Sequence, residues 1–267
     1  MSIQNKTVFI LGASTGIGFA MACELAKHNN TLCLFARDIK KLELAKTQIE
    51  RSGVKGPCHI FSADAKNYDA LKLAFEIAVN EVGAPDIMIN CVGRAYPDHF
   101  ENITPAMMQD TMQTNFGSIW NAAQIILPYM KVKGGKIVNT SSVAGFMGVF
   151  GYADYSASKF AIIGFSEVLK QELAKYNIGV QVISPPDTDT PGYESENRSK
   201  PKETKKISES GKVLSSDEVA RQALRGIESG KFMILPGTDS KLTYWLKRYC
   251  PFILDGIISR AIRQGKG

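Results

Sequence analysis

A glycine-rich turn near the amino end constrains the fold of this chain more strongly than any other feature. It joins the apolar run at residues 7–11, which predicts a buried strand, to a periodic apolar stretch through Leu25, which predicts a helix. Glycines in such a turn let the backbone approach a pyrophosphate, and the following helix presents unpaired amide hydrogens and a positive dipole end. We therefore expect a nucleotide site on a parallel sheet. The expected contacts from this turn are Gly12, Ser14, Thr15, Gly16, Ile17 and Gly18.

Apolar runs and helical patterns alternate along the rest of the chain. We expect strands near 6–11, 31–36, 57–62, 86–90, 135–140, 179–184 and 232–235, each but the last followed by a helix, and one long helix over 153–176. This order predicts an α/β, Rossmann-type doubly wound parallel sheet of about seven strands, with helices on both faces. At 267 residues the chain is expected to be one domain, 1–267. Within it we place a core at 5–237, a substrate lid at about 186–212 and an amphipathic helical tail at 239–264.

The end of the second strand bears on the choice of nucleotide. An acidic residue that binds a ribose 2′-hydroxyl is expected there, but Ala36 and then Arg37 occupy the place. A guanidinium suits a 2′-phosphate, and the missing carboxylate removes a repulsion. We therefore expect NADP(H) rather than NAD. The alternative is that Arg37 is a surface cation that begins a helix, its charge reduced by Asp38.

Tyr155, Lys159 and Ser142 form the second informative pattern. Residues four apart on a helix share a face, so the Lys159 ammonium is expected beside the Tyr155 phenol, where it would lower the phenol pKa toward working pH. Tyr68 and Tyr129 also precede a lysine by four residues, but only Tyr155 has a serine thirteen residues upstream. Ser142 follows an apolar run that predicts a strand ending at the ligand-binding edge of the sheet. The pattern indicates proton transfer at a carbonyl.

These motifs, together with Asn90-Cys91-Val92-Gly93 and Asn115, resemble the classical short-chain dehydrogenase/reductase family over roughly residues 5 to 235. The resemblance implies that Tyr155 protonates the substrate oxygen, Ser142 orients it, and Lys159 lowers the phenol pKa and binds the nicotinamide ribose. It implies that Asn115 holds a water molecule linked to Lys159. It also implies cofactor contacts from Asp64, Ala65, Asn90, Gly93, Tyr155, Lys159, Pro185, Thr188 and Thr190. For Asp64, capping of the next helix is an open alternative.

The segment from Pro185 to Ser208 is similar to that of the 3-ketodihydrosphingosine reductases. This resemblance implies NADPH-dependent reduction of the 3-keto group of a long-chain keto-amine lipid, giving dihydrosphingosine. Residues 193–212 are rich in charge and poor in apolar anchors, so we expect a polar surface loop that acts as a mobile lid over the substrate.

The carboxyl tail is basic and amphipathic. Residues 241–266 hold six cations against one carboxylate, Asp255, and so five of the six net positive charges of the chain. The apolar residues of the tail are Leu242, Trp245, Leu246, Tyr249, Phe252, Ile253, Ile257 and Ile258, with Pro251 between the two groups. This stripe favours peripheral contact with an anionic membrane, or else packing over the pocket or at a dimer interface. We do not expect nucleic-acid binding, because the rest of the chain is nearly neutral.

Cysteine and histidine usage bears on compartment and metal. The five cysteines are scattered and the three histidines isolated, so we expect free thiols of a reducing compartment and no metal site. No signal peptide is visible, and no apolar run reaches the ~18–20 residues of a spanning helix. We expect a cytoplasmic protein, not secreted and without a transmembrane span, that touches the cytoplasmic membrane face through its tail, and that forms a homodimer or homotetramer.

Three functions fit the sequence. The first is the sphingoid-base ketone reductase. The second is an NADP-dependent reductase of another ketone, such as a steroid, acyl or polyketide carbonyl, which would share the same catalytic residues. The third is an NADP-binding scaffold without turnover, against which the complete set of Asn115, Ser142, Tyr155 and Lys159 argues.

Overall fold

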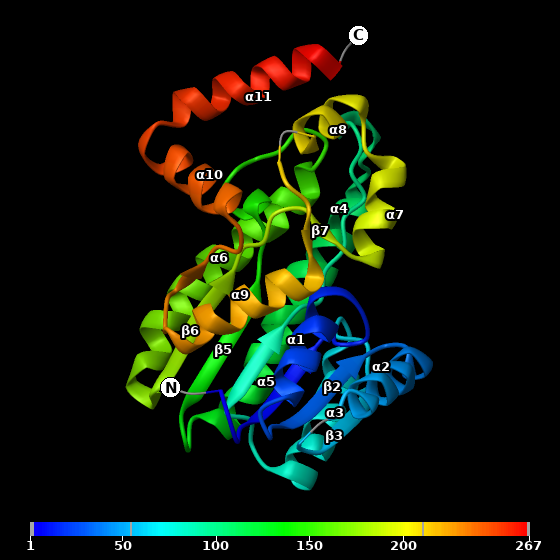
Figure 1. The fold of residues 1–267 in the computed structure, drawn as a ribbon, viewed down its shortest axis with the longest axis vertical. Coiled ribbons are helices and arrows are strands. Elements are labelled where there is room, and N and C mark those ends of the chain that lie inside the picture. The colour runs from blue at the N-terminus through cyan, green and yellow to red at the C-terminus, as the bar shows by residue number, and fades with distance from the viewer. Residues whose placement is uncertain (1–2, 54, 210, 266–267) are drawn as a thin grey trace.

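The computed structural model describes residues 3–53, 55–209 and 211–265. Its centre is a parallel sheet with the strand order β3-β2-β1-β4-β5-β6-β9 (Figure 1). The strands are β1 (Thr7–Leu11), β2 (Thr31–Ala36), β3 (Cys58–Ser62), β4 (Ile87–Asn90), β5 (Gly135–Thr140), β6 (Ile178–Ile183) and β9 (Met233–Ile234). Each strand begins and ends within one residue of its expected range, and the predicted parallel α/β sheet is confirmed.

Helices cover both faces of this sheet (Figure 1). The helices α1 (Gly16–Ala26), α2 (Ile39–Arg51) and α9 (Ser216–Glu228) pack on one face. The helices α3 (Tyr68–Val82), α5 (Ser118–Met130) and α6 (Ala153–Leu173) pack on the other. The helix expected over 153–176 ends at Leu173 and continues as a 3-10 turn, Ala174–Tyr176.

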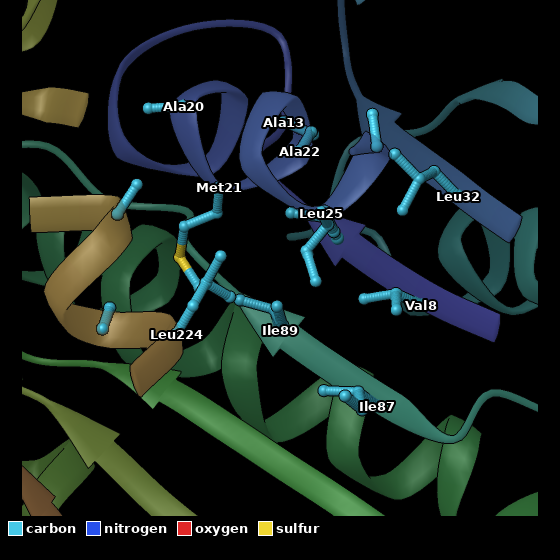
Figure 2. Close-up of a cluster of buried hydrophobic side chains, with 14 of the residues drawn as sticks. Val8, Ala13, Ala20, Met21, Ala22, Leu25, Leu32, Ile87, Ile89 and Leu224 are labelled. Atoms are coloured by element: carbon cyan, nitrogen blue, oxygen red, sulfur yellow. The ribbon is translucent and has the colours of Figure 1, made fainter. Parts of the chain in front are cut away.

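The two cores explain why the strands read as continuous apolar runs. Successive side chains of a strand point to opposite faces, and here both faces are covered. Val8 therefore packs under α1, while its neighbour Phe9 packs against α3 and α5. Figure 2 shows Met21 and Leu25 of α1 lying over Val8 and Ile89. These residues are fully buried, which holds the start of α1 at the end of β1.

A single helix was expected between β4 and β5, but this connection contains several helical elements. It holds a 3-10 turn (Phe100–Asn102), α4 (Pro105–Met112) and a π-helical turn (Gln113–Gly117) before α5 begins. A second 3-10 turn, Val143–Gly145, follows β5. Single π-helical turns occur frequently at functional sites, and this one carries Asn115.

The expectation of a polar surface loop at 193–212 is wrong for the described part of this segment. It contains most of α7 (Pro191–Ser199) and all of α8 (Lys202–Ser208). The short strands on either side of it, β7 (Thr188–Asp189) and β8 (Leu214–Ser215), pair with each other. Thr190 caps α7 by accepting a hydrogen bond from the Tyr193 amide at 3.1 Å, and Pro191 follows at the first helical position. Buried polar contacts hold the segment, such as the 2.9 Å bond from the Thr204 hydroxyl to the Phe150 carbonyl.

The tail forms two helices, α10 (Thr238–Tyr249) and α11 (Pro251–Gly265), which are separated at Pro251 as expected. The helix α11 lies against α8 at one end of the molecule (Figure 1). Across the residues that the structure describes, no helix has the length and apolar character needed to span a bilayer.

Candidate active site

A cleft of about 750 Å³ lies at the carboxyl edge of the sheet. The connections from β1 and β4 leave in opposite directions there, which is where α/β proteins bind ligands. The cleft is lined by sixteen of the eighteen expected site residues, namely Gly12, Ser14, Thr15, Gly16, Ile17, Gly18, Arg37, Asp64, Ala65, Gly93, Ser142, Tyr155, Lys159, Pro185, Thr188 and Thr190.

The glycine turn packs tightly on the segment that follows β4. Gly12 has φ +86°, and a Cβ added there would lie 2.9 Å from the Cys91 carbonyl carbon. A Cβ at Gly18 would lie 2.3 Å from the Gly12 oxygen. The turn therefore excludes side chains at both positions, and the backbone itself faces the cleft.

The start of α1 is suited to a phosphate group. Thr15 is the N-cap, yet its side chain makes no cap hydrogen bond, and the first turn contains no acidic residue. The amide hydrogens of this turn, which lack intrahelical partners, together with the helix dipole, favour an anion at this point of the cleft.

The end of β2 presents cations to the cleft. Arg37 is exposed, and among the described residues it forms no ion pair with Asp38. Asp38 instead caps α2 by accepting a hydrogen bond from the Lys41 amide at 3.2 Å. Lys41, which was not predicted as a site residue, also lines the cleft.

The capping alternative for Asp64 is wrong. The N-cap of α3 is Asn67, whose side chain accepts from the Ala70 amide at 3.1 Å. Asp64 lines the cleft and accepts a hydrogen bond from the Lys66 amide at 3.0 Å.

Tyr155, Lys159 and Ser142 meet in the cleft. Tyr155 and Lys159 lie on the first turns of α6, and the Lys159 Nζ is 5.5 Å from the centre of the Tyr155 ring. Ser142, just beyond β5, lines the cleft together with Tyr155, and its hydroxyl lowers the pKa of the Tyr155 phenol. The Lys159 side chain is almost fully buried, and its ammonium donates to the Thr140 carbonyl at 3.0 Å.

The expected lowering of the Tyr155 pKa is wrong for the protein without cofactor. Burial raises the pKa of Tyr155 above its ordinary value, Glu196 raises it further, and the Ser142 hydrogen bond lowers it. Burial also lowers the pKa of Lys159 to about 8. The effect of burial on the Tyr155 pKa exceeds that of the Lys159 cation, because the ammonium donates to the Thr140 carbonyl rather than to the phenol oxygen. At neutral pH the phenol is therefore protonated, as a proton donor must be.

Asn115 lies behind the cleft, close to Lys159. Its side chain exchanges two hydrogen bonds with the Arg94 backbone, of 2.9 and 3.0 Å, and donates to the Ser158 hydroxyl at 3.0 Å. A Cβ at Gly93 would lie 3.2 Å from the Lys159 Nζ and 3.6 Å from the Asn115 Oδ1. The absence of a side chain at Gly93 thus lets Lys159 and Asn115 approach each other.

Asn90 does not line the cleft. Its side chain is fully buried and donates to Asn139 at 2.8 Å, so it joins β4 to β5. The Asn90 side chain therefore does not make the cofactor contact that was expected of this residue.

The far end of the cleft holds a charged cluster that was not predicted from the sequence. Tyr152, Asp187, Tyr193 and Glu196 line the cleft beside Tyr155, and Lys200 lies behind them. The only signal for this cluster was the spacing of Glu196 and Lys200, four residues apart on one helix face.

A Rossmann-type sheet whose switch-point cleft holds a serine, a tyrosine and a lysine defines an oxidoreductase class. The family model for short chain dehydrogenases matches residues 6–201, and the chain belongs to this family. The family and the fold imply a nicotinamide cofactor and an enzyme that acts on CH–OH or C=O groups. The glycine turn and the open start of α1 fit the pyrophosphate of such a cofactor.

Similar proteins narrow this class. The 3-dehydrosphinganine reductase of Danio rerio is 36% identical over 243 residues, which are 90% of this chain and 73% of that protein. The 3-ketodihydrosphingosine reductase of Dictyostelium discoideum is 36% identical over 258 residues, 90% of this chain and 77% of that protein. Among solved structures, levodione reductase superposes with a TM-score of 0.82 at 21% identity, covering 89% of this chain and 98% of that chain. The likeness to levodione reductase concerns the fold alone.

Proposed function

We propose that this protein reduces the 3-keto group of 3-ketodihydrosphingosine to the alcohol of dihydrosphingosine, with NADPH. The main support for this proposal is that Ser142, Tyr155 and Lys159 lie together in one cleft. The chain is also similar to proteins that are named for this activity. Turnover of this ketone by the purified protein is the direct test.

The residues of the chain act on the carbonyl oxygen. NADPH, when bound, supplies the hydride that adds to the carbonyl carbon. Tyr155 transfers its phenol proton to the oxygen, so that the C=O bond becomes CH–OH, and Ser142 donates a hydrogen bond that orients this oxygen. Lys159 supplies a cation below the phenol, which stabilises the phenolate left behind and binds ribose hydroxyls. Asn115 acts on Lys159 from the side: the Asn115 Oδ1 and the Lys159 Nζ both lie next to Gly93, where no side chain separates them.

Arg37 supports the choice of NADPH over NADH. Arg37→Ala is expected to raise the Kd for NADPH about 10- to 100-fold and to change that for NADH by less than about threefold, because only NADPH carries the 2′-phosphate. Fluorescence titration of both nucleotides measures this. Lys40→Ala is the matched control, since Lys40 is an exposed cation three residues further on, in the first turn of α2 and outside the cleft. Equal effects on both nucleotides would contradict the assignment.

The tail supports peripheral contact with an anionic membrane at the cytoplasmic face. Six of the eight residues of its apolar stripe are exposed, namely Leu242, Trp245, Tyr249, Phe252, Ile253 and Ile257. Other tail residues face inward: Leu254 is buried, and Asp239, Ser240 and Thr243 line the cleft. An apolar outer face flanked by Lys247 and Arg248 suits a surface of anionic lipid, and a membrane bound to that face would lie close to the cleft, which the inner face lines.

The double variant Trp245→Ser, Phe252→Ser is expected to lower the partition coefficient for phosphatidylglycerol vesicles by about 10-fold or more, because two large apolar side chains no longer enter the lipid. Vesicle co-sedimentation measures the partitioning. Reduction of a short water-soluble ketone reports that the cleft is intact. Leu44→Ser and Leu73→Ser, on α2 and α3, are the matched controls: they remove exposed apolar residues elsewhere and should leave the partition coefficient for the vesicles unchanged. Unchanged binding by the double variant would contradict the membrane role.

A homodimer or homotetramer is the assembly that we propose. Trp120, Phe160 and Val168 are exposed on α5 and α6, and the Trp120 ring stacks on Phe165 with 5.0 Å between centroids. Apolar patches of this kind typically mark interaction sites. Light scattering of the purified protein gives the mass, and a monomer would contradict the assembly.

A further inference from the structure

A buried ionic cluster stands at the far end of the cleft. The Lys200 side chain is 0% exposed, and its ammonium lies 3.1 Å from a Glu196 carboxylate oxygen and 3.6 Å from one of Asp187. The Tyr152 hydroxyl donates a hydrogen bond to Glu196, and the Tyr193 hydroxyl donates to Asp187 at 3.3 Å. The phenol and the ammonium contact the same Glu196 oxygen, Oε1, and together they restrain the carboxylate.

The cluster adjoins the proposed proton donor. The Tyr152 ring centre is 5.5 Å from that of Tyr155, and the field of Glu196 contributes to the raised Tyr155 pKa. Glu196 and Asp187 line the same cleft as Tyr155, whereas Lys200 is not among the lining residues. A ligand whose carbonyl oxygen lies at Tyr155 therefore meets carboxylates, and not the lysine, at its next polar group.

The charges of the cluster do not balance. Two carboxylates, Glu196 and Asp187, face one cation, Lys200, which leaves one net negative charge. Burial raises the pKa of Glu196, as expected of a carboxylate that is poorly solvated and incompletely paired. Of the other cleft cations, Arg94 and Lys66 pair with Asp110 on α4. A cationic group on the ligand would offset the remaining charge.

We propose that Glu196 binds the ammonium group of the substrate and makes the enzyme selective for ketones that carry an amine on the carbon next to the carbonyl. This inference rests on the proposed function, in which the substrate is such a keto-amine. Tyr152 and Lys200 are positioning residues that hold the Glu196 carboxylate. The adjacency of Tyr152 and Tyr155 matches a ligand whose amine and carbonyl are on neighbouring carbons.

The test compares two ketones with NADPH: 3-ketodihydrosphingosine and the same molecule with hydrogen in place of the amino group. Glu196→Gln keeps the size and the hydrogen bond to Tyr152 but removes the charge. It is expected to lower the ratio of kcat/KM for the amine to that for the amine-free ketone by roughly 10- to 100-fold. Glu194→Gln, the same change on the exposed face of α7, should leave the ratio at its wild-type value.

An unchanged ratio in Glu196→Gln, whether or not kcat/KM falls equally on both ketones, would overturn the assignment of Glu196 and leave the proposed function intact. Failure of the wild-type protein to reduce the keto-amine, with the amine-free ketone turned over, would overturn both. A second test uses only the wild-type protein and so does not depend on folding of the variant. It compares inhibition by a long-chain primary amine with inhibition by the alcohol of equal length. The amine is expected to inhibit at least about 10-fold more strongly, and equal inhibition would contradict the ammonium site.

Discussion

Tyr155→Phe is expected to lower kcat for ketone reduction by about 10³-fold while the Kd for NADPH changes by less than about threefold. The substitution removes only the hydroxyl, and the ring remains in place beside Tyr152. Because burial keeps the phenol protonated at neutral pH, the hydroxyl can serve as the proton donor that we propose for the ketone oxygen. Steady-state kinetics and fluorescence titration of NADPH separate the loss of chemistry from the loss of binding.

Tyr68→Phe is the matched control for this variant. Tyr68 also precedes a lysine by four residues on a helix, but it is exposed and lies outside the cleft. Its substitution should leave kcat unchanged. A Tyr155→Phe enzyme with wild-type kcat would show that another group donates the proton.

Lys159→Met is expected to lower kcat/KM for NADPH by about 10²-fold or more, because it removes the buried cation to which we assign ribose binding and stabilisation of the phenolate. The pH profile gives a second prediction. Burial lowers the pKa of Lys159 to about 8, so the ammonium is present below that pH and is lost as the pH rises through it. The profile for the wild-type protein should therefore fall above pH ~8, since kcat/KM reports the ionisations of the free enzyme.

The variant should show a flat profile in the same range. Cys91, the neighbouring thiol, does not interfere, because burial raises its pKa to about 11. Lys72→Met, which removes the lysine four residues after Tyr68, is the control and should keep the wild-type profile. A fall above pH ~8 that persists in Lys159→Met would show that another group titrates there.

Much of the fold could be predicted because both faces of the sheet are buried. Strands such as β1 and β5 then read as uninterrupted apolar runs between turns, and the glycine turn after β1 allows few other structures. The meeting of Ser142, Tyr155 and Lys159 was also accessible from the sequence, because one residue follows a strand and the other two share a helix face.

The rest depends on contacts between distant segments. Asn90 was expected in the cleft, but its bond to Asn139 turns it inward, and no local pattern indicates that choice. The direction of the Tyr155 pKa shift follows from burial, which the spacing to Lys159 does not reveal. Glu196 reaches Tyr152 across 44 positions of sequence, in a segment whose charged composition suggested a loop.

The identity of the substrate is tested most directly by turnover. The first measurement is NADPH oxidation by the purified protein with 3-ketodihydrosphingosine in detergent micelles, compared with NADH and with steroid and acyl ketones. We expect turnover of the sphingoid ketone that is selective for NADPH and exceeds that of the other ketones. Turnover of another ketone, with the keto-amine left unreduced, would contradict the substrate assignment and retain the proton chemistry of Tyr155.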